Sequence, residues 1–124
     1  MDWTELEIFK GIDLNDSFVM NWSHEGGQVI FELEASIWPE SEYYQEPKNS
    51  EYTCYRKAIL KFTEFDSCTG LLKASTVKTT RDPDGSIDYG VIESLSKNDF
   101  GFNVSGEFGS VNLIGGSISF EVFT

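Results

Sequence analysis

Apolar and polar residues alternate over residues 28–38, and this pattern constrains the fold of the chain more than any other feature. Side chains of a β-strand point to opposite faces in turn, so strict alternation predicts a strand with one buried face. Similar blocks recur along the rest of the sequence, bounded by Gly, Pro, Asn or Asp. The chain is therefore expected to be all-β. The residues on the buried face of this block are Val29, Phe31, Leu33, Ala35 and Ile37.

Further blocks of this kind predict seven to eight strands, mostly antiparallel because the connections are short. Gly26–Gly27 is typical of a hairpin turn, and Pro39 ends the strand that follows because proline lacks an amide hydrogen. We expect a single domain over residues 1–124, folded as a sandwich or a partly open barrel. A capping-box pattern at Thr4–Glu7 predicts a short N-terminal helix, and a strand over residues 6–9 is the alternative. The other predicted strands are residues 17–22, 52–62, 71–80, 87–95, 100–104 and one or two more within 106–123.

The cysteines and the N-terminal sequence favour a cytoplasmic protein. Met1–Glu5 is acidic, whereas a secretory signal begins with basic and then apolar residues. No apolar run approaches the roughly 20 residues that a membrane-spanning helix requires. If residues 52–62 and 71–80 form a hairpin, Cys54 and Cys68 lie too far apart for a disulfide, so two free thiols are expected.

The charge of the chain is strongly negative and unevenly distributed. The sequence carries 21 acids and 9 bases, for a net charge of −12, and residues 1–51 hold twelve of these acids and only two of the bases. Such a surface repels the phosphates of nucleic acids and anionic membranes, so neither is expected as a direct partner. Solubility alone explains net acidity. Acidity also attracts a basic protein, such as a nuclease or another nucleic-acid-binding protein.

The longest irregular stretch, residues 39–50, is the best candidate for a binding loop. It has two prolines and spans about a dozen residues, a length at which functional loops are common. Aromatic rings bury a large area at small entropic cost, and surrounding acids suit a basic partner. Two alternatives stay open: the rings bind a sugar, or they fold back and cap one end of the barrel. Trp38 is expected to point away from the core face of its strand. The predicted partner-binding residues are Trp38, Glu40, Glu42, Tyr43, Tyr44, Glu46 and Tyr52.

Patterns that would indicate catalysis or metal binding are weak. His24 is the one histidine and lies in a glycine-rich turn, and no Gly-x-Ser-x-Gly motif presents a nucleophile. Residues 82–93 match several ligand positions of an EF-hand calcium loop, but Ile87 stands where Gly is required, so a hairpin turn is the interpretation. Two cysteines and one histidine do not make a structural zinc site without carboxylates. We expect no enzyme activity, no metal and no cofactor.

Several stretches of the sequence resemble small uncharacterised bacterial all-β proteins. They are Leu14–Ser17 leading to Trp22, Phe31–Ala35, Cys54–Phe62 and Gly106–Gly109. Size and acidity also resemble those of immunity proteins, which neutralise a co-expressed toxin, but the resemblance carries no known functional residues. Together with the charge, it favours a non-catalytic cytoplasmic protein-interaction module that binds a basic partner such as a toxin. The alternative is a β-domain that binds a small ligand or a carbohydrate. The oligomeric state is open, and the weakly apolar residues 71–80 are a candidate edge strand for a dimer.

Overall fold

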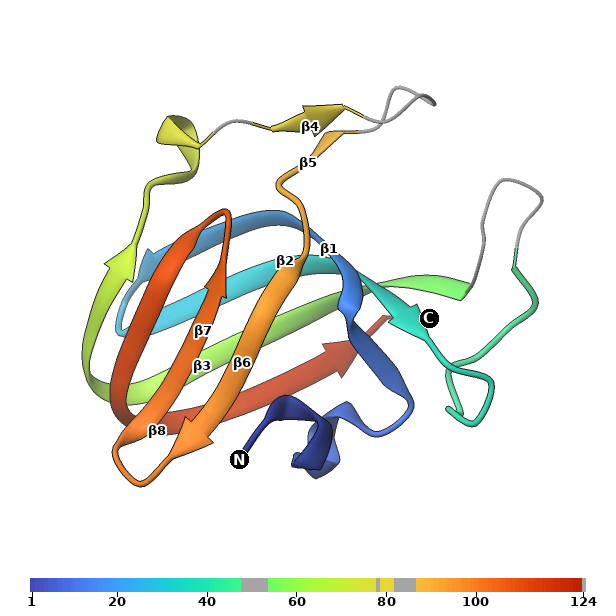
Figure 1. Ribbon diagram of the computed structural model, residues 1–124, viewed down its shortest axis with the longest axis horizontal. Coiled ribbons are helices and arrows are strands. Elements are labelled where there is room, and N and C mark those ends of the chain that lie inside the picture. Colours follow the sequence, from blue (N-terminus) through green and yellow to red (C-terminus); the bar gives the residue numbers. More distant parts are fainter. Residues whose placement is uncertain (48–53, 78, 82–86, 124) are drawn as a thin grey trace.

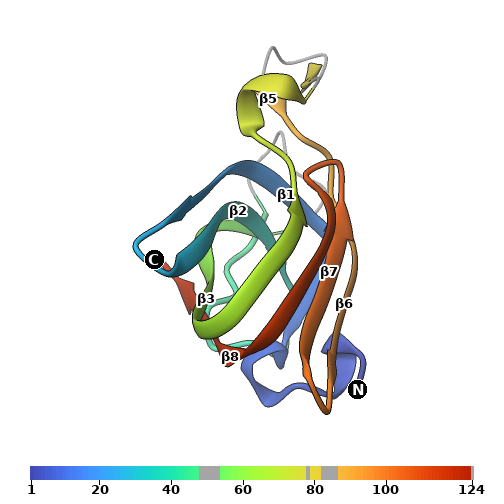
Figure 2. The ribbon, with the colours of Figure 1, turned by 90° about the vertical axis from the view of Figure 1, so that its left-hand side faces the viewer.

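The computed structural model describes residues 1–47, 54–77, 79–81 and 87–123, and over these residues the chain is all-β (Figure 1). One six-stranded antiparallel sheet forms the body of the molecule, with the strand order β1-β2-β3-β8-β7-β6. The sheet curls into a half-barrel, with β1, β2 and β3 on one side and β7 and β6 on the other (Figure 2). Its strands are β1 (Ile12–Glu25), β2 (Gln28–Ile37), β3 (Cys54–Leu71), β6 (Ile92–Asn98), β7 (Gly101–Gly106) and β8 (Gly109–Val122).

The inner face of the sheet holds the core, and alternation along β2 decides which side chains reach it. Phe31 and Leu33 are buried, whereas Glu32 between them is exposed. The ring centroid of Phe31 lies 6.2 Å from that of Phe62 and 4.7 Å from that of Phe108, so aromatic contacts join β2, β3 and the β7–β8 turn. The side chains predicted to face the core from this strand are all buried: Val29, Phe31, Leu33, Ala35 and Ile37.

A large bulge interrupts the pairing of β1 with β2. The register jumps from Asp13 opposite Ser36 to Phe18 opposite Glu34, so β1 has extra residues at this point. Ser17 fills the break, because its buried hydroxyl donates to the Asp13 carbonyl at 2.7 Å and accepts the Ser36 N–H at 2.9 Å. The hydroxyl thereby supplies hydrogen bonds that the broken ladder does not make.

Hydrogen bonds from β1 to the chain entering β6 join the two edges of the sheet at one place. The Val19 N–H donates to the Gly90 carbonyl at 2.8 Å, and the Val19 carbonyl accepts the Tyr89 N–H at 2.9 Å. Within the bulge, the Asn15 side-chain amide donates to the Ile92 carbonyl at 3.0 Å. These bonds satisfy some of the backbone N–H and C=O groups at the two edges of the sheet, which would otherwise be free to pair with another chain.

Single 3-10 turns take the place of the expected N-terminal helix: η1 (Trp3–Glu5) and η2 (Glu7–Phe9). The capping interaction starts two residues earlier than predicted, since the Glu5 carboxylate accepts the Asp2 N–H at 3.0 Å. Trp3 and Phe9 are buried with their rings perpendicular and 6.3 Å apart, so core packing and not helix formation fixes this segment. No helix within the described residues is long and apolar enough to cross a membrane.

The prediction of seven to eight strands was wrong for the sheet, which has six over the described residues. β8 continues through Gly115–Gly116 as one strand, and β3 continues past its predicted end through Glu64, which has a positive φ of 58°. The described residues between Leu71 and Thr80 do not form the predicted fourth strand of the sheet; β3 extends to Leu71 and pairs with β2 and β8 instead. The chain then forms short elements of its own: η3 (Ala74–Thr76), β4 (Thr80–Arg81) and β5 (Ile87–Asp88).

Both cysteines lie on β3, and both are free thiols as predicted. Cys54 is buried at the start of the strand, and Cys68 is half-buried near its end, since residues 63–70 continue β3 and do not form the turn of the predicted hairpin. Burial raises the pKa of the Cys68 thiol above its ordinary value. The predicted turn at residues 82–85 lies outside the described part of the chain.

Candidate functional site

The segment that follows β2, residues 38–47, is built onto the N-terminal part of the chain. The Trp38 N–H donates to the Gly11 carbonyl at 2.9 Å. Two tight turns follow, in which the Trp38 carbonyl accepts the Ser41 N–H at 3.0 Å and the Ser41 carbonyl accepts the Tyr44 N–H at 3.1 Å. Gly11 has a φ of +77°, and a Cβ there would lie 2.7 Å from the Ser41 Cβ. Glycine is therefore required where the two segments meet.

The aromatic rings of this segment fold back onto the core. Trp38 is half-buried with its ring centroid 6.5 Å from that of Trp3, so the prediction that it points away from the core was wrong. Alternation ceases to apply because β2 ends at Ile37, and the N-terminal turn supplies a ring for Trp38 to contact. Tyr43 and Tyr44 are also half-buried against the core. Packing at this end of the half-barrel is therefore one role of the loop rings.

Polar contacts tie the far side of the loop to β3. The Gln45 N–H donates to the Cys54 sulfur at 3.4 Å. The Arg56 guanidinium donates to the Gln45 side-chain carbonyl at 2.5 Å and to the Tyr55 backbone carbonyl at 2.9 Å. Arg56 interrupts the apolar alternation of β3, and these contacts explain its presence there. The loop is thus held at both of its ends.

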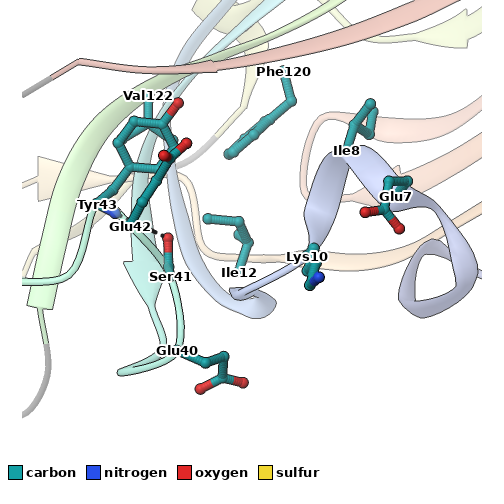
Figure 3. A pocket seen from close by; sticks show the side chains of 10 residues that line it. All are labelled: Glu7, Ile8, Lys10, Ile12, Glu40, Ser41, Glu42, Tyr43, Phe120 and Val122. Atoms are coloured by element: carbon teal, nitrogen blue, oxygen red, sulfur yellow. Dashed lines mark hydrogen bonds between the residues drawn. The ribbon is translucent and has the colours of Figure 1, made fainter.

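A cleft of about 350 Å³ opens between this loop, the N-terminal segment and the end of β8 (Figure 3). Ile12, Phe120 and Val122 line its apolar floor, and Tyr43 lines it from the loop. The Phe120 ring packs on buried Phe9, with 5.2 Å between ring centroids. The floor is therefore supported by the core.

Three carboxylates surround this floor. Glu40 and Glu42 come from the loop and Glu7 from η2, and all three side chains are exposed. Lys10 is the one basic residue among the described residues that line the cleft, and Ile8, 38 % exposed, adds apolar surface to the rim. The cleft therefore combines an apolar interior with an excess of negative charge at its edge, which suits a cationic side chain with a long apolar stem.

The structure gathers part of the predicted set of binding residues in this cleft: Glu40, Glu42 and Tyr43. Trp38 and Tyr44 contribute to packing beside it, and Glu46 is exposed on the loop without lining the cleft. Tyr52 lies outside the described residues.

Sequence reasoning missed the cleft residues that come from the two ends of the chain: Glu7, Ile8, Lys10, Ile12, Phe120 and Val122. A signal for the last two was present, because Phe120 and Val122 alternate with exposed Glu121 on the final strand. Their meeting with the N-terminal segment depends on β8 lying next to β3 in the sheet, and strand order does not follow from local patterns.

Within the described residues, the other candidate chemical sites do not bring catalytic or metal-binding side chains together. His24 is exposed near the end of β1, and its ring lies 5.6 Å from that of Phe65. The described residues contain no group of three or more His, Cys, Asp or Glu placed to hold a metal ion. The residues of the calcium-loop pattern at 82–86 lie outside the described chain. The absence of enzyme activity stays a prediction.

Comparison of the chain with protein-family models, with curated proteins and with solved structures gave no match. The resemblance to immunity proteins therefore stays a prediction, and the chemistry of the cleft is the guide to function.

Proposed function

We propose that the protein is a non-catalytic interaction protein that holds a basic segment of a protein partner in the cleft beside the 38–47 loop. The observation that carries the proposal is an apolar floor and an acidic rim within one concavity. Lys and Arg side chains pack their carbon atoms on apolar surface and keep the charge at its edge, so one such side chain satisfies both features. In this arrangement the stem lies on the apolar floor, and the charge lies at the rim, where the exposed carboxylates of Glu40 and Glu42 attract it.

The charge of the whole chain supports the same proposal. A net charge of −12 attracts a basic protein over a distance and raises its rate of association. Toxins that act on nucleic acids belong to this partner class, because they must themselves bind phosphates. We propose a cytoplasmic location, which the two free thiols support because a reducing compartment keeps cysteines unpaired.

Affinity capture from a lysate of the native host tests the proposal, with bound proteins identified by mass spectrometry. The bait is compared with the variant Glu40→Lys/Glu42→Lys and with a matched control, Glu93→Lys/Glu107→Lys, which makes the same charge change at exposed residues outside the cleft. We expect a basic protein that the wild type and the control retain and that the cleft variant loses. If the cleft variant and the control both lose the basic protein, only net charge matters for binding. If the cleft variant retains the basic protein as well as the wild type does, the cleft is excluded as the binding site.

The alternative function is the binding of a small ligand or a carbohydrate, and the volume and lining of the cleft support it. A volume of about 350 Å³ falls in the range of small-molecule sites, and Tyr43 offers a ring beside carboxylates that accept hydrogen bonds from hydroxyl groups. A ligand that binds only the folded state raises the melting temperature. A thermal-shift screen of sugars should then give hits for the wild type that Tyr43→Ala abolishes. A screen without hits would remove this alternative.

A further inference from the structure

The second half of β8 has a neighbouring strand on one side only. β7 pairs with β8 as far as Gly101 opposite Ile114, and β8 then continues to Val122. On the other side β3 accompanies β8 to its end, with Ala58 opposite Val122. Within the described chain, residues 116–122 therefore form an open edge of the sheet on the side away from β3.

The hydrogen-bond pattern of β8 identifies the backbone groups at this edge. The Phe123 N–H donates to the Lys57 carbonyl at 2.8 Å, so the backbone of Phe123 faces β3. Along an antiparallel strand, the backbone groups of successive residues face its two sides in turn. Glu121 therefore also faces β3, whereas the N–H and carbonyl groups of Phe120 and Val122 face the open edge. Among the described residues, no backbone group bonds to either residue on that side.

The same two residues line the cleft with their side chains. Phe120 and Val122 are both half-buried, and both belong to the cleft floor. Figure 3 shows the Phe120 side chain pointing into the cleft, with Glu42 and Tyr43 of the loop on one side of it and Glu7 on the other. Unpaired backbone groups and an acidic cleft with an apolar floor thus meet at the end of β8.

We propose that the basic partner binds by adding an extended segment to β8 at residues 116–122, as a further strand of the sheet. Segments bound in this way gain main-chain hydrogen bonds from the edge and specificity from the side chains at alternate positions. The proposal rests on the proposed function, because the acidic rim is what selects a basic occupant.

Strand pairing fixes which side chains of the partner enter the cleft. Residues directly opposite each other in a sheet project from the same face. A partner residue opposite Phe120 therefore projects into the cleft, and its two neighbours project outward beside exposed Ser119 and Glu121. The expected partner segment has basic residues at every second position, about 7 Å apart, and not at the spacing of three or four that one face of a helix requires.

The capped peptide Lys-Thr-Lys-Thr-Lys-Thr is the probe for the added strand. Two further peptides carry backbone N-methyl groups, one on its lysines and the other on its threonines. N-methylation removes N–H groups without changing the charge, and only one of the two sets of N–H groups in an added strand faces β8. Affinity for the isotope-labelled protein and the exchange rate of each amide are measured by nuclear magnetic resonance. Glu40→Lys/Glu42→Lys and its control Glu93→Lys/Glu107→Lys are titrated in the same way.

We expect the unmethylated peptide and one methylated peptide to bind, and the other methylated peptide to bind at least about tenfold more weakly, because it loses hydrogen bonds to β8. The weak binder is the lysine-methylated peptide if the added strand is antiparallel, since the bonded residues then lie directly opposite Phe120 and Val122. The amides of these two residues should exchange more slowly in the complex, whereas the Glu121 amide, which already faces β3, should change little.

Three results would each overturn the added strand: no binding of the unmethylated peptide, equal binding of the two methylated peptides, or unchanged exchange at Phe120 and Val122. If the variant Glu40→Lys/Glu42→Lys nevertheless loses the partner captured from the lysate and its control does not, only the added strand fails and the cleft stands. Peptide binding that the cleft variant does not weaken would count against both proposals.

Discussion

Replacing Ser17 by alanine removes one hydroxyl that joins both sides of the β1 bulge. The side chain is fully buried, so water does not take its place. Its loss leaves the Asp13 carbonyl and the Ser36 N–H without the partners that they have at 2.7 and 2.9 Å. We therefore expect Ser17→Ala to lower the free energy of unfolding without changing the fold.

The size of the loss follows from the two groups left behind. A buried polar group without a hydrogen-bond partner costs about 1–3 kcal/mol. The Ser36 N–H is buried and the Asp13 carbonyl only partly so, and the variant no longer has to desolvate the hydroxyl. The net expectation is a loss of about 2 kcal/mol, a large part of the stability of a small domain.

Urea unfolding followed by tryptophan fluorescence measures this loss. With a denaturant slope of roughly 1–3 kcal/mol per M, the midpoint should fall by about 1 M at an unchanged slope. Ser105→Ala removes a hydroxyl that bonds only to the exposed Ser94 hydroxyl, and it should cost less than about 0.5 kcal/mol. A loss for Ser17→Ala no larger than that of Ser105→Ala would refute the argument that this hydroxyl holds the bulge.

Other residues give predictions about binding and reactivity. Tyr43→Ala should weaken the binding of a basic partner by about 2 kcal/mol in titration calorimetry. Tyr44 does not line the cleft, so Tyr44→Ala should weaken binding by clearly less. Equal losses of affinity in the two variants would contradict the assignment of the binding site to the cleft. Glu40→Lys/Glu42→Lys should mainly slow association and flatten its salt dependence in stopped-flow measurements, whereas an effect confined to dissociation would argue against steering. The Cys68 thiol should react more slowly with iodoacetamide at pH 8 than a free cysteine, because burial raises its pKa and lowers the thiolate fraction; a rate equal to that of free cysteine would contradict this.

Much of the fold follows from local patterns in the sequence. Alternation predicts β2 almost to the residue, and the Gly26–Gly27 turn joins β1 to β2 with both glycines at positive φ, 59° and 75°. The same rules fail where a strand bends without ending. Gly115–Gly116 has the composition of a turn, yet β8 continues through it, because it stays paired with β3, which takes up an extra residue between Phe65 and Ser67. Local sequence does not distinguish a turn from a bulge when a neighbouring strand decides between them.

The candidate site could be predicted only in part for the same reason. Glu40, Glu42 and Tyr43 are adjacent in sequence, so composition alone marks them as a surface feature. Phe120 reaches them only because β8 lies beside β3, which is a long-range pairing. Trp38 was placed wrongly because its packing partner, Trp3, comes from η1, which precedes β1 and is distant in sequence. Contacts between distant segments are set by strand order, which short patterns do not contain.

Hydrogen–deuterium exchange with the basic partner recovered by capture tests the central claim most directly. The proposed cleft predicts slower exchange in the complex at residues 7–10 and 40–43, the segments around η2 and in the loop that line it. The variant Glu40→Lys/Glu42→Lys should lose this protection under the same conditions. Protection confined to other surfaces, such as the β6–β7 hairpin, would show that the partner binds elsewhere and would contradict the account.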